Sequence, residues 1–174
     1  MIRGKWIIVL WCALLLIGCG GRGPQRPSQR MGSAPQPDSA QLALLELNQQ
    51  LALTADKQLM QTAQASGEVY ALYEGNTWIC FLQRGDVDSP APQANEEWQI
   101  HLRVYSLDKR LLTDSEHSYT FGRHELPAAV ESNQSEWRHG TQARMLVPWY
   151  SGYGIRGTDA IAPYENIIIE IELR

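Results

Sequence analysis

The residue types that carry most enzyme chemistry are present in this chain, but the sequence does not bring them together. The four histidines, His101, His117, His124 and His139, are scattered. No Ser/His/Asp set, Cys/His cluster or carboxylate pair has a spacing that would build a nucleophile, a metal site or an acid–base pair. We therefore expect the histidines at solvated surface positions, and we predict neither a metal nor a cofactor.

The N-terminal end has the pattern of an export signal. A positively charged start precedes an apolar run, Trp6–Ile17, that is much shorter than the roughly 20 residues of a membrane-spanning helix. The run closes with Leu16-Ile17-Gly18-Cys19, which resembles the bacterial lipoprotein processing box, where the thiol receives a diacylglycerol. We expect a lipoprotein signal peptide at residues 1–18 and a lipid anchor on Cys19 in the bacterial cell envelope. A plain secretory signal is the alternative.

The other cysteines have no comparable context. Cys12 leaves with the signal peptide, so Cys80 is the one unmodified thiol of the mature chain and no internal disulfide can form. We expect Cys80 to be a small core residue rather than a reactive thiol, because no cationic group or histidine lies beside it in the sequence. The residue after Cys19 is Gly20 rather than Asp, which in many Gram-negative bacteria implies sorting to the outer membrane.

The composition indicates one folded domain with appendages. The chain has 174 residues and a formal net charge of −4, and no block of Lys or Arg stands out beyond the N-terminal end. The distribution of charges therefore gives no indication of a nucleic-acid partner. Residues 19–39 are rich in Gly, Pro, Ser, Gln and Arg and contain almost nothing apolar, which predicts a flexible tether.

Residues 40–66 are predicted to form one amphipathic helix, with a break near Thr54 as an option. Ser39 can cap its start and Gly67 can end it. The apolar residues that recur at helical spacing are Leu42, Leu45, Leu53, Leu59, Met60 and Ala63. Such a helix could dock on its own domain, which is the favoured interpretation, pair with a second copy of the chain, or contact another partner.

Residues 67–174 have the pattern of a small antiparallel sheet. Trp98, Ile100, Leu102 and Val104 alternate with residues of the opposite face, which predicts a strand with one buried side. A short helix is expected between Leu126 and Trp137. Further strands are predicted at 69–73, 77–83, 118–121, 142–147 and 166–173. Together these elements predict an α+β domain.

The C-terminal part carries short motifs in a fixed order. They are Gly140, Ala143-Arg144-Met145-Leu146-Val147-Pro148, Tyr153-Gly154, Gly157, Ile161-Ala162-Pro163 and Ile167-Ile168-Ile169-Glu170-Ile171-Glu172-Leu173. Their order and spacing resemble the end of an FKBP-type peptidyl-prolyl isomerase, and a weaker likeness extends upstream to about Val69. The resemblance implies a curved antiparallel sheet wrapped on one short helix. Lipoproteins with a helix before such a domain, common in Bacteroidota, have a similar layout.

The resemblance also implies an apolar pocket that binds proline-containing polypeptides. Tyr153 matches the family tyrosine whose hydroxyl bonds the substrate, and Ile161 matches the isoleucine beside it. Leu126 or Pro127 matches the position whose backbone amide meets the substrate carbonyl, and Pro127 would lack that donor. The other pocket positions implied by the resemblance are Val104, Leu112, Thr113, Tyr119, Phe121, Val130 and Ile169.

Several of these positions depart from the family pattern. Val104, Leu112, Thr113, Val130 and Ile169 stand, in that order, where the family usually has Tyr, Phe, Asp, Trp and Phe. The pocket implied by the resemblance is therefore apolar but poor in aromatic rings. Trp149 and Tyr150 could compensate, or could cap the edge of the sheet.

Two functional hypotheses follow. The first is a prolyl isomerase that assists the folding of exported proteins; it needs neither nucleophile nor metal, because an apolar pocket favours the twisted X-Pro amide. The second is a catalytically weak or inactive FKBP-like protein-binding module, motivated by Val104, Thr113 and Val130. We favour the enzyme, because this chemistry tolerates apolar exchanges better than acid–base chemistry would.

Overall fold

The computed structural model describes residues 38–174, of which 39–174 form one compact unit. The signal peptide, Cys19 and nearly all of the tether expected at 19–39 lie outside the described residues. The two apolar clusters described below lie within 39–174, so this part contains the contacts it needs to fold by itself. Within the described part, no helix is long and apolar enough to cross a bilayer.

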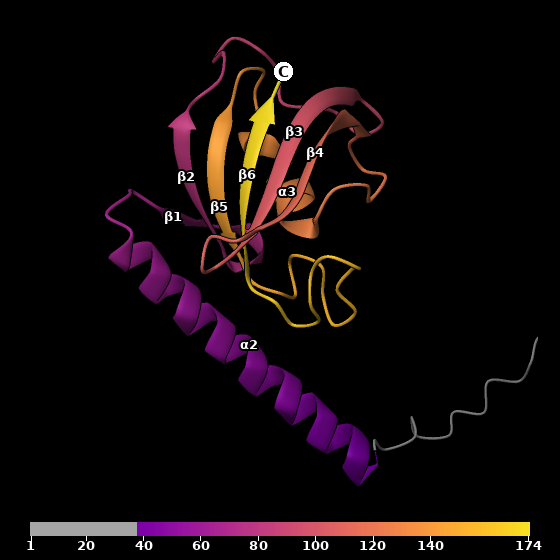
Figure 1. Cartoon of the computed structure of the whole chain (residues 1–174). Coiled ribbons are helices and arrows are strands. Elements are labelled where there is room, and N and C mark those ends of the chain that lie inside the picture. The colour runs from indigo at the N-terminus through magenta and orange to yellow at the C-terminus, as the bar shows by residue number, and fades with distance from the viewer. Residues whose placement is uncertain (1–37) are drawn as a thin grey trace, which may run out of the picture. The chain divides into compact units, whose positions relative to one another are not determined.

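One antiparallel sheet forms the centre of this unit (Figure 1). Its spatial order, β1-β2-β5-β6-β3-β4, differs from the order along the chain. The strands are β1 (Ala71–Tyr73), β2 (Thr77–Gln83), β3 (Glu97–Ser106), β4 (Leu111–Thr120), β5 (Gln142–Val147) and β6 (Ile167–Leu173). Because β6 lies between β5 and β3, the last strand of the chain joins the two halves of the sheet.

The inner face of the sheet carries the main apolar cluster. Side chains alternate between the two faces of a strand, so every second residue of β3 and β6 points the same way. On the inner face these are Ile100, Leu102, Val104, Ile167, Ile169, Ile171 and Leu173, all of them buried. The alternation that the sequence shows at 98–104 therefore marks the core.

The short helix α3 (Ala128–Ser132) covers this inner face, followed by the turn η2 (Gln134–Glu136). Ala129 and Val130 are fully buried. The backbone N–H of Ala129 donates to the carbonyl of Ser151 at 2.8 Å, which attaches the loop between β5 and β6 to the helix. The sheet thus wraps around α3 (Figure 1).

The long helix α2 (Ser39–Ala65) packs on the opposite, outer face of the sheet. Leu59 and Ala63 form a second apolar cluster with Leu146 of β5 and Ile168 of β6. The helix is continuous, so the break considered near Thr54 does not occur. Its buried residues all lie in its second half.

The predicted α+β fold class is confirmed. The largest difference concerns β4, which begins at Leu111 although the sequence pattern indicated a strand only at 118–121. This strand lies at the edge of the sheet and pairs with β3 alone. Its residues are exposed or half-buried, so they show no apolar alternation from which a strand could be predicted.

Leu59→Ala is expected to lower the free energy of unfolding by ~2–5 kcal/mol, because it opens a cavity between α2 and the sheet. Urea denaturation of residues 38–174 measures this. Leu82→Ala is the control: Leu82 is 53% exposed, and its loss should change stability by only ~0.5 kcal/mol. Equal losses in the two variants would contradict the contact between α2 and the outer face.

Candidate functional site

Tyr153 lies in the loop between β5 and β6, and turn hydrogen bonds fix its position. The carbonyl of Trp149 accepts hydrogen bonds from the N–H groups of Gly152 at 3.2 Å and Gly154 at 2.7 Å. The carbonyl of Tyr153 accepts one from Gly157 at 3.2 Å. Gly154 has a φ of 71°, a left-handed conformation that glycine adopts without a steric penalty. The turn holds the Tyr153 side chain against the inner face of the sheet.

The phenol of Tyr153 is half-buried against the inner apolar cluster. Burial, and to a smaller degree the neighbouring Tyr119, raises the pKa of Tyr153 to about 12, so the hydroxyl stays protonated at physiological pH. Within residues 38–174 this hydroxyl has no hydrogen-bond partner. It is therefore able to donate a hydrogen bond to the carbonyl of a bound polypeptide.

The fold brings the predicted pocket residues together. Six of them are buried in the inner cluster, namely Val104, Phe121, Leu126, Val130, Ile161 and Ile169. Leu112, Tyr119 and Tyr153 are partly buried and pack against it. Thr113 pairs with Val104 between β4 and β3, and Val104 pairs with Ile169 between β3 and β6. These last three residues form a row across three strands on one face.

Leu126 and Pro127, the two candidates for the backbone donor, directly precede α3. Pro127 directly precedes α3 and has no N–H group. Leu126 has an N–H group that forms no hydrogen bond within the described part of the chain. Of the two residues, Leu126 is therefore the one that can supply a backbone donor at this place.

Trp137 is an aromatic residue of the site to which the family resemblance assigned no role. It is fully buried in the inner cluster, and its Nε1 donates to the carbonyl of Val130 at 2.8 Å. Its ring lies 6.1 Å from that of Phe81. An indole therefore lies beside Val130, where the resemblance suggested that an indole had been lost. The motif gave no signal for it, because Trp137 comes seven residues later in the chain.

Trp149 and Tyr150 do not replace the missing pocket rings. The Tyr150 hydroxyl donates to Asp56 of α2 and accepts a hydrogen bond from Asn76 at 3.1 Å. The Trp149 ring packs edge-on against Tyr150 and against Tyr164, with centroids 5.3 and 4.8 Å apart. The two residues attach the loop to α2 and to itself.

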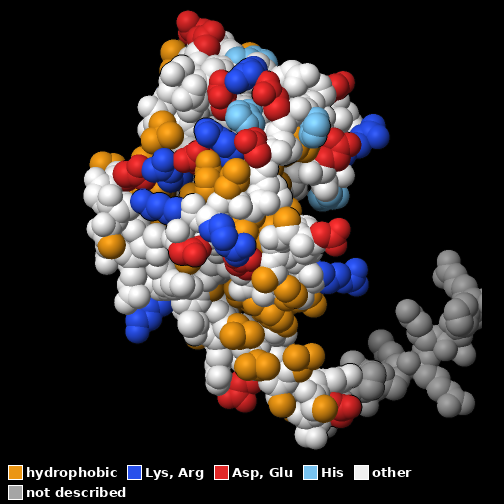
Figure 2. Space-filling model, viewed as in Figure 1, with side chains coloured by type: hydrophobic (Ala, Val, Ile, Leu, Met, Phe, Trp, Pro, Cys, Tyr) orange, Lys and Arg blue, Asp and Glu red, His pale blue; other side chains and the backbone are white. Residues whose placement is uncertain are grey.

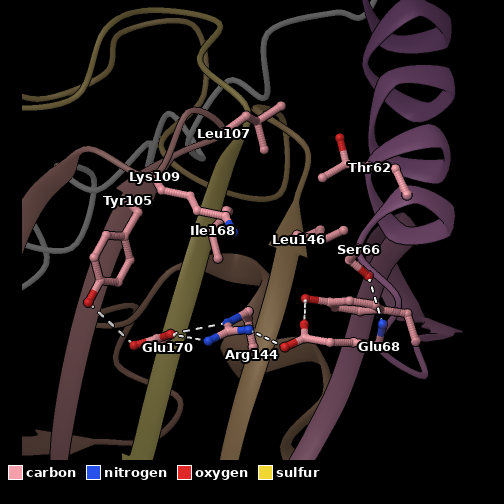
Figure 3. A pocket seen from close by; sticks show the side chains of 12 residues that line it. Thr62, Ser66, Glu68, Tyr105, Leu107, Lys109, Arg144, Leu146, Ile168 and Glu170 are labelled. Carbon is pink, nitrogen blue, oxygen red and sulfur yellow. Dashed lines mark hydrogen bonds and ion pairs between the residues drawn. The ribbon is translucent and has the colours of Figure 1, made fainter.

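A groove of about 480 Å³ lies on the outer face, at the C-terminal end of α2 (Figure 3). Leu146 and Ile168 line it, and they alternate along β5 and β6 with inner-face residues such as Met145 and Ile169. The groove therefore opens on the side of the sheet opposite to Tyr153.

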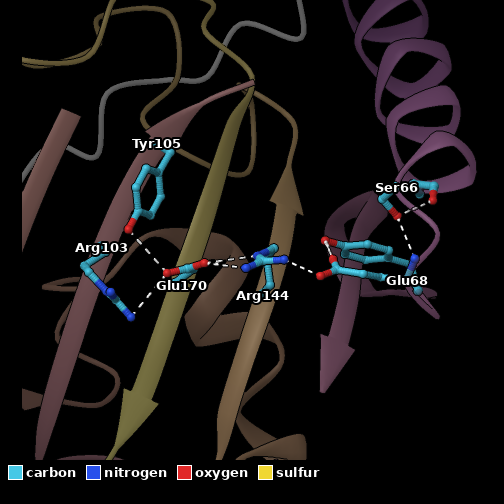
Figure 4. A network of polar contacts seen from close by, with 8 residues as sticks. Ser66, Glu68, Arg103, Tyr105, Arg144 and Glu170 are labelled. Atoms are coloured by element: carbon cyan, nitrogen blue, oxygen red, sulfur yellow. Dashed lines mark hydrogen bonds and ion pairs between the residues drawn. The ribbon is translucent and has the colours of Figure 1, made fainter. Parts of the chain in front are cut away.

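A charged network crosses this outer face (Figure 4). Glu170 accepts hydrogen bonds from Arg144 Nε at 3.1 Å, from Arg144 Nη2 at 2.7 Å and from the Tyr105 hydroxyl at 3.3 Å, and it forms an ion pair with Arg103 at 3.2 Å. Arg144 also pairs with Glu68. The network therefore ties the segment after α2 to three strands.

The remaining reactive side chains form no larger cluster in the part of the chain that the structure describes. Among residues 38–174, no three His, Cys, Asp or Glu side chains gather as metal ligands. His101 Nε2 lies 2.7 Å from Asp114, and the His139 ring stacks on Trp98 at 3.8 Å. Cys80 is buried as predicted, and burial is the main cause that raises the pKa of its thiol.

Solved structures of peptidyl-prolyl isomerases and FKBP domains share this fold. A peptidyl-prolyl cis-trans isomerase from Pseudomonas syringae pv. tomato matches with a TM-score of 0.59 and 21% identity, over 71% of this chain and 92% of that chain. The N-terminal domain of FKBP42 from Arabidopsis thaliana matches with a TM-score of 0.53 and 15% identity, over 61% and 90%. No protein-family model and no curated protein matches the sequence. The chain therefore has an FKBP-like fold, as the resemblance implied.

Glu68→Gln is expected to reduce the pH dependence of stability. Burial alone would raise the pKa of Glu68, but hydrogen bonds from Tyr70 and Arg144 outweigh it and lower that pKa. A lowered pKa means that the carboxylate stabilises the fold above its unfolded pKa of roughly 4.3, and that this contribution is lost as the pH falls through the folded pKa. The variant should therefore be less stable than the wild type at neutral pH, and the difference should shrink in acid.

Urea unfolding at neutral and acidic pH measures the difference. Glu97→Gln is the control, because Glu97 is exposed and its side chain has no partner within the described residues. A stability difference for Glu68→Gln that stays constant with pH would contradict the role of the ion pair.

Proposed function

We propose that this chain is a prolyl isomerase of the FKBP type that assists the folding of exported proteins. The observation that supports this most directly is the Tyr153 phenol in an FKBP-like fold. It borders an apolar cluster, and its hydroxyl has no hydrogen-bond partner among the residues that the structure describes. Proline-containing polypeptides would bind at this cluster. The reaction requires no cofactor.

The chemistry follows from the resonance of the X-Pro amide. Rotation about this bond has a barrier of roughly 18–20 kcal/mol, because the planar form delocalises charge between nitrogen and oxygen. The twisted amide has lost this charge separation and is less polar. An apolar surface that excludes water therefore binds the twisted form better than the planar form, and this difference in binding lowers the barrier.

Each residue of the site has a role that fits this mechanism. The Tyr153 hydroxyl would donate to a carbonyl of the bound polypeptide, and the N–H of Leu126 would offer a second donor. The partly buried side chains of Leu112 and Tyr119 would provide the apolar contact surface, and the buried Val104, Ile161 and Ile169 would support it from behind. These groups position the peptide on both sides of the rotating bond, and none of them changes its protonation state.

A catalytically weak or inactive binding module is the second candidate. It is favoured by Thr113, which stands where the family usually has Asp, and by the aliphatic side chains of Val104 and Ile169. Such a module would hold proline-containing segments at the same place but would not distinguish the twisted amide from the planar one.

Tyr153→Phe is expected to lower kcat/KM for a proline peptide by about 2- to 10-fold, the contribution of one neutral hydrogen bond. A protease-coupled isomerisation assay on residues 38–174 measures this. Tyr164→Phe is the matched control, because Tyr164 lies in the same loop but bonds weakly to Asn48 of α2, at 3.4 Å.

The same assay separates the two candidates. If micromolar wild-type protein does not accelerate the reaction above background, catalysis is rejected. Binding of the same peptide, followed by NMR and weakened in Tyr153→Phe, would then support the binding module. If Tyr153→Phe keeps both the activity and the binding of the wild type, a role for this tyrosine is excluded.

We further propose that a lipid on Cys19 anchors the domain to the bacterial cell envelope, in the outer membrane, as in lipoproteins of the Bacteroidota type. The processing box at residues 16–19 and Gly20 after it support this. A flexible chain of the length of residues 20–38 spans about 20–25 Å, which leaves the domain free to reach polypeptides beside the membrane.

Cys19→Ala should abolish incorporation of radiolabelled palmitate when the full chain is expressed in a Gram-negative host, because the thiol is the site of acylation. Cys12→Ala is the control and should leave labelling unchanged, since Cys12 lies within the proposed signal peptide. Equal labelling of the wild type and the Cys19 variant would overturn the anchor.

A further inference from the structure

The side chain of Asp56 lies where α2 meets the loop between β5 and β6. The helix is held on its domain by its second half, because its buried residues, Ala55, Leu59 and Ala63, all lie there. The first half leaves hydrophobic side chains exposed (Figure 2). Asp56 follows Ala55 at the edge of the buried face and is itself half-buried. Its carboxylate is therefore within reach of the domain.

Both carboxylate oxygens of Asp56 accept hydrogen bonds from the domain. Oδ1 accepts one from the hydroxyl of Tyr150, and Oδ2 accepts one from Asn76 Nδ2 at 3.3 Å. Asn76 Nδ2 also donates to the Tyr150 hydroxyl at 3.1 Å, so the three side chains close a ring of hydrogen bonds. Burial, and then the bond to Asp56, raises the pKa of Tyr150 to about 12, so this hydroxyl keeps the proton that it donates.

The bond between Tyr150 and Asp56 is the strongest side-chain link between α2 and this loop. A hydrogen bond to an ionised acceptor is roughly twice as strong as one between neutral groups. The link from Asn166 to Gln58, at 2.9 Å, joins two neutral amides, and Gln58 is exposed. Loss of the Asp56 carboxylate is therefore the single change on α2 that should loosen the loop most.

Tyr150 lies inside the turn that presents Tyr153. The carbonyl of Trp149 closes this turn. The next residue, Ser151, holds the turn to the inner side of the domain, because its carbonyl accepts a hydrogen bond at 2.8 Å from an N–H group of α3. Tyr150 holds the same turn to α2. A turn that is fixed from two sides has fewer conformations, which keeps the Tyr153 phenol at the apolar cluster before a polypeptide binds.

We propose that Asp56 is a positioning residue of the site: through Tyr150 it holds the turn in the conformation that presents Tyr153. The effect of Asp56 on catalysis rests on the proposed isomerase function, whereas its effect on the turn does not. The functional unit therefore begins with α2 and not with β1.

Amide hydrogen exchange of residues 38–174, followed by NMR, tests the effect on the turn. The N–H of Gly154 is the probe, because it donates to the carbonyl that closes the turn. Asp56→Ala should speed its exchange at least about fivefold, since the turn opens more often once Tyr150 is released. Asp56→Asn keeps an acceptor for the Tyr150 hydroxyl and should stay within about twofold of the wild type.

Leu59→Ala is the control for a merely structural effect. It weakens the packing of α2 on the sheet but leaves the Asp56 carboxylate in place. This variant should speed the exchange of the Gly154 N–H no more than that of the N–H groups within β6, because any increase then reflects the stability of the whole domain.

Kinetics with a proline peptide test the effect on the site. If only a fraction of the molecules holds the turn in its binding conformation, KM rises by the inverse of that fraction while kcat stays the same. Asp56→Ala and Tyr150→Phe are each expected to raise KM about 3- to 10-fold and to keep kcat within about twofold. The double variant should lose no more than either single variant, because both changes remove the same bond.

Four results would overturn the positioning role of Asp56. The first is Gly154 exchange in Asp56→Ala that matches the wild type, and the second is exchange in Asp56→Asn that is as fast as in Asp56→Ala. The third is an equally selective increase in Leu59→Ala, and the fourth is additive losses in the double variant. If the wild type does not catalyse isomerisation, the proposed function fails, and the exchange of the Gly154 N–H still decides whether Asp56 holds the turn.

Discussion

Burial of β6 on both faces is the constraint on which the rest of the structure depends. Ile167, Ile169, Ile171 and Leu173 enter the inner cluster, while Ile168 enters the outer one. A strand with apolar residues on both faces needs a cover on each side, and here α3 covers one face and α2 the other. Because β5 and β3 pair with the two edges of β6, the two halves of the sheet are also joined there.

The parts of the fold that bury apolar residues in a regular period could be predicted from the sequence. The alternation at Trp98–Val104, the apolar run at 166–173 and the helical spacing at 40–66 mark β3, β6 and α2. Most of β4 could not be predicted, because an edge strand exposes many of its side chains and needs no apolar period. The spatial order of the strands was not predicted, since periodicity says nothing about which strands are neighbours.

The candidate site shows the same division. The resemblance named Tyr153, Ile161 and the residues around them, and the fold brings these residues to one apolar cluster. It could not indicate Trp137, which lies outside the motif, and it left Leu126 and Pro127 as alternatives for the backbone donor. The resemblance also could not indicate the outer network, because Glu68 lies 76 positions before Arg144 and the motif that contains Arg144 does not identify a partner for its side chain.

The loop that carries Tyr153 also depends on α2, although that helix lies on the other side of the sheet. Two side-chain hydrogen bonds join the loop to the second half of the helix, from Tyr150 to Asp56 and from Asn166 to Gln58 at 2.9 Å. The bond from Tyr164 to Asn48 is longer, at 3.4 Å, and contributes less. Tyr150 is three residues from Tyr153, within the turn that the Trp149 carbonyl closes. A contiguous path of bonded groups therefore connects the helix to the phenol. Because a loop loses conformational freedom when its ends and its middle are fixed, α2 reduces the entropy cost of holding Tyr153 at the apolar cluster. The helix therefore helps to position the site, mainly through its second half, which carries Asp56 and Gln58.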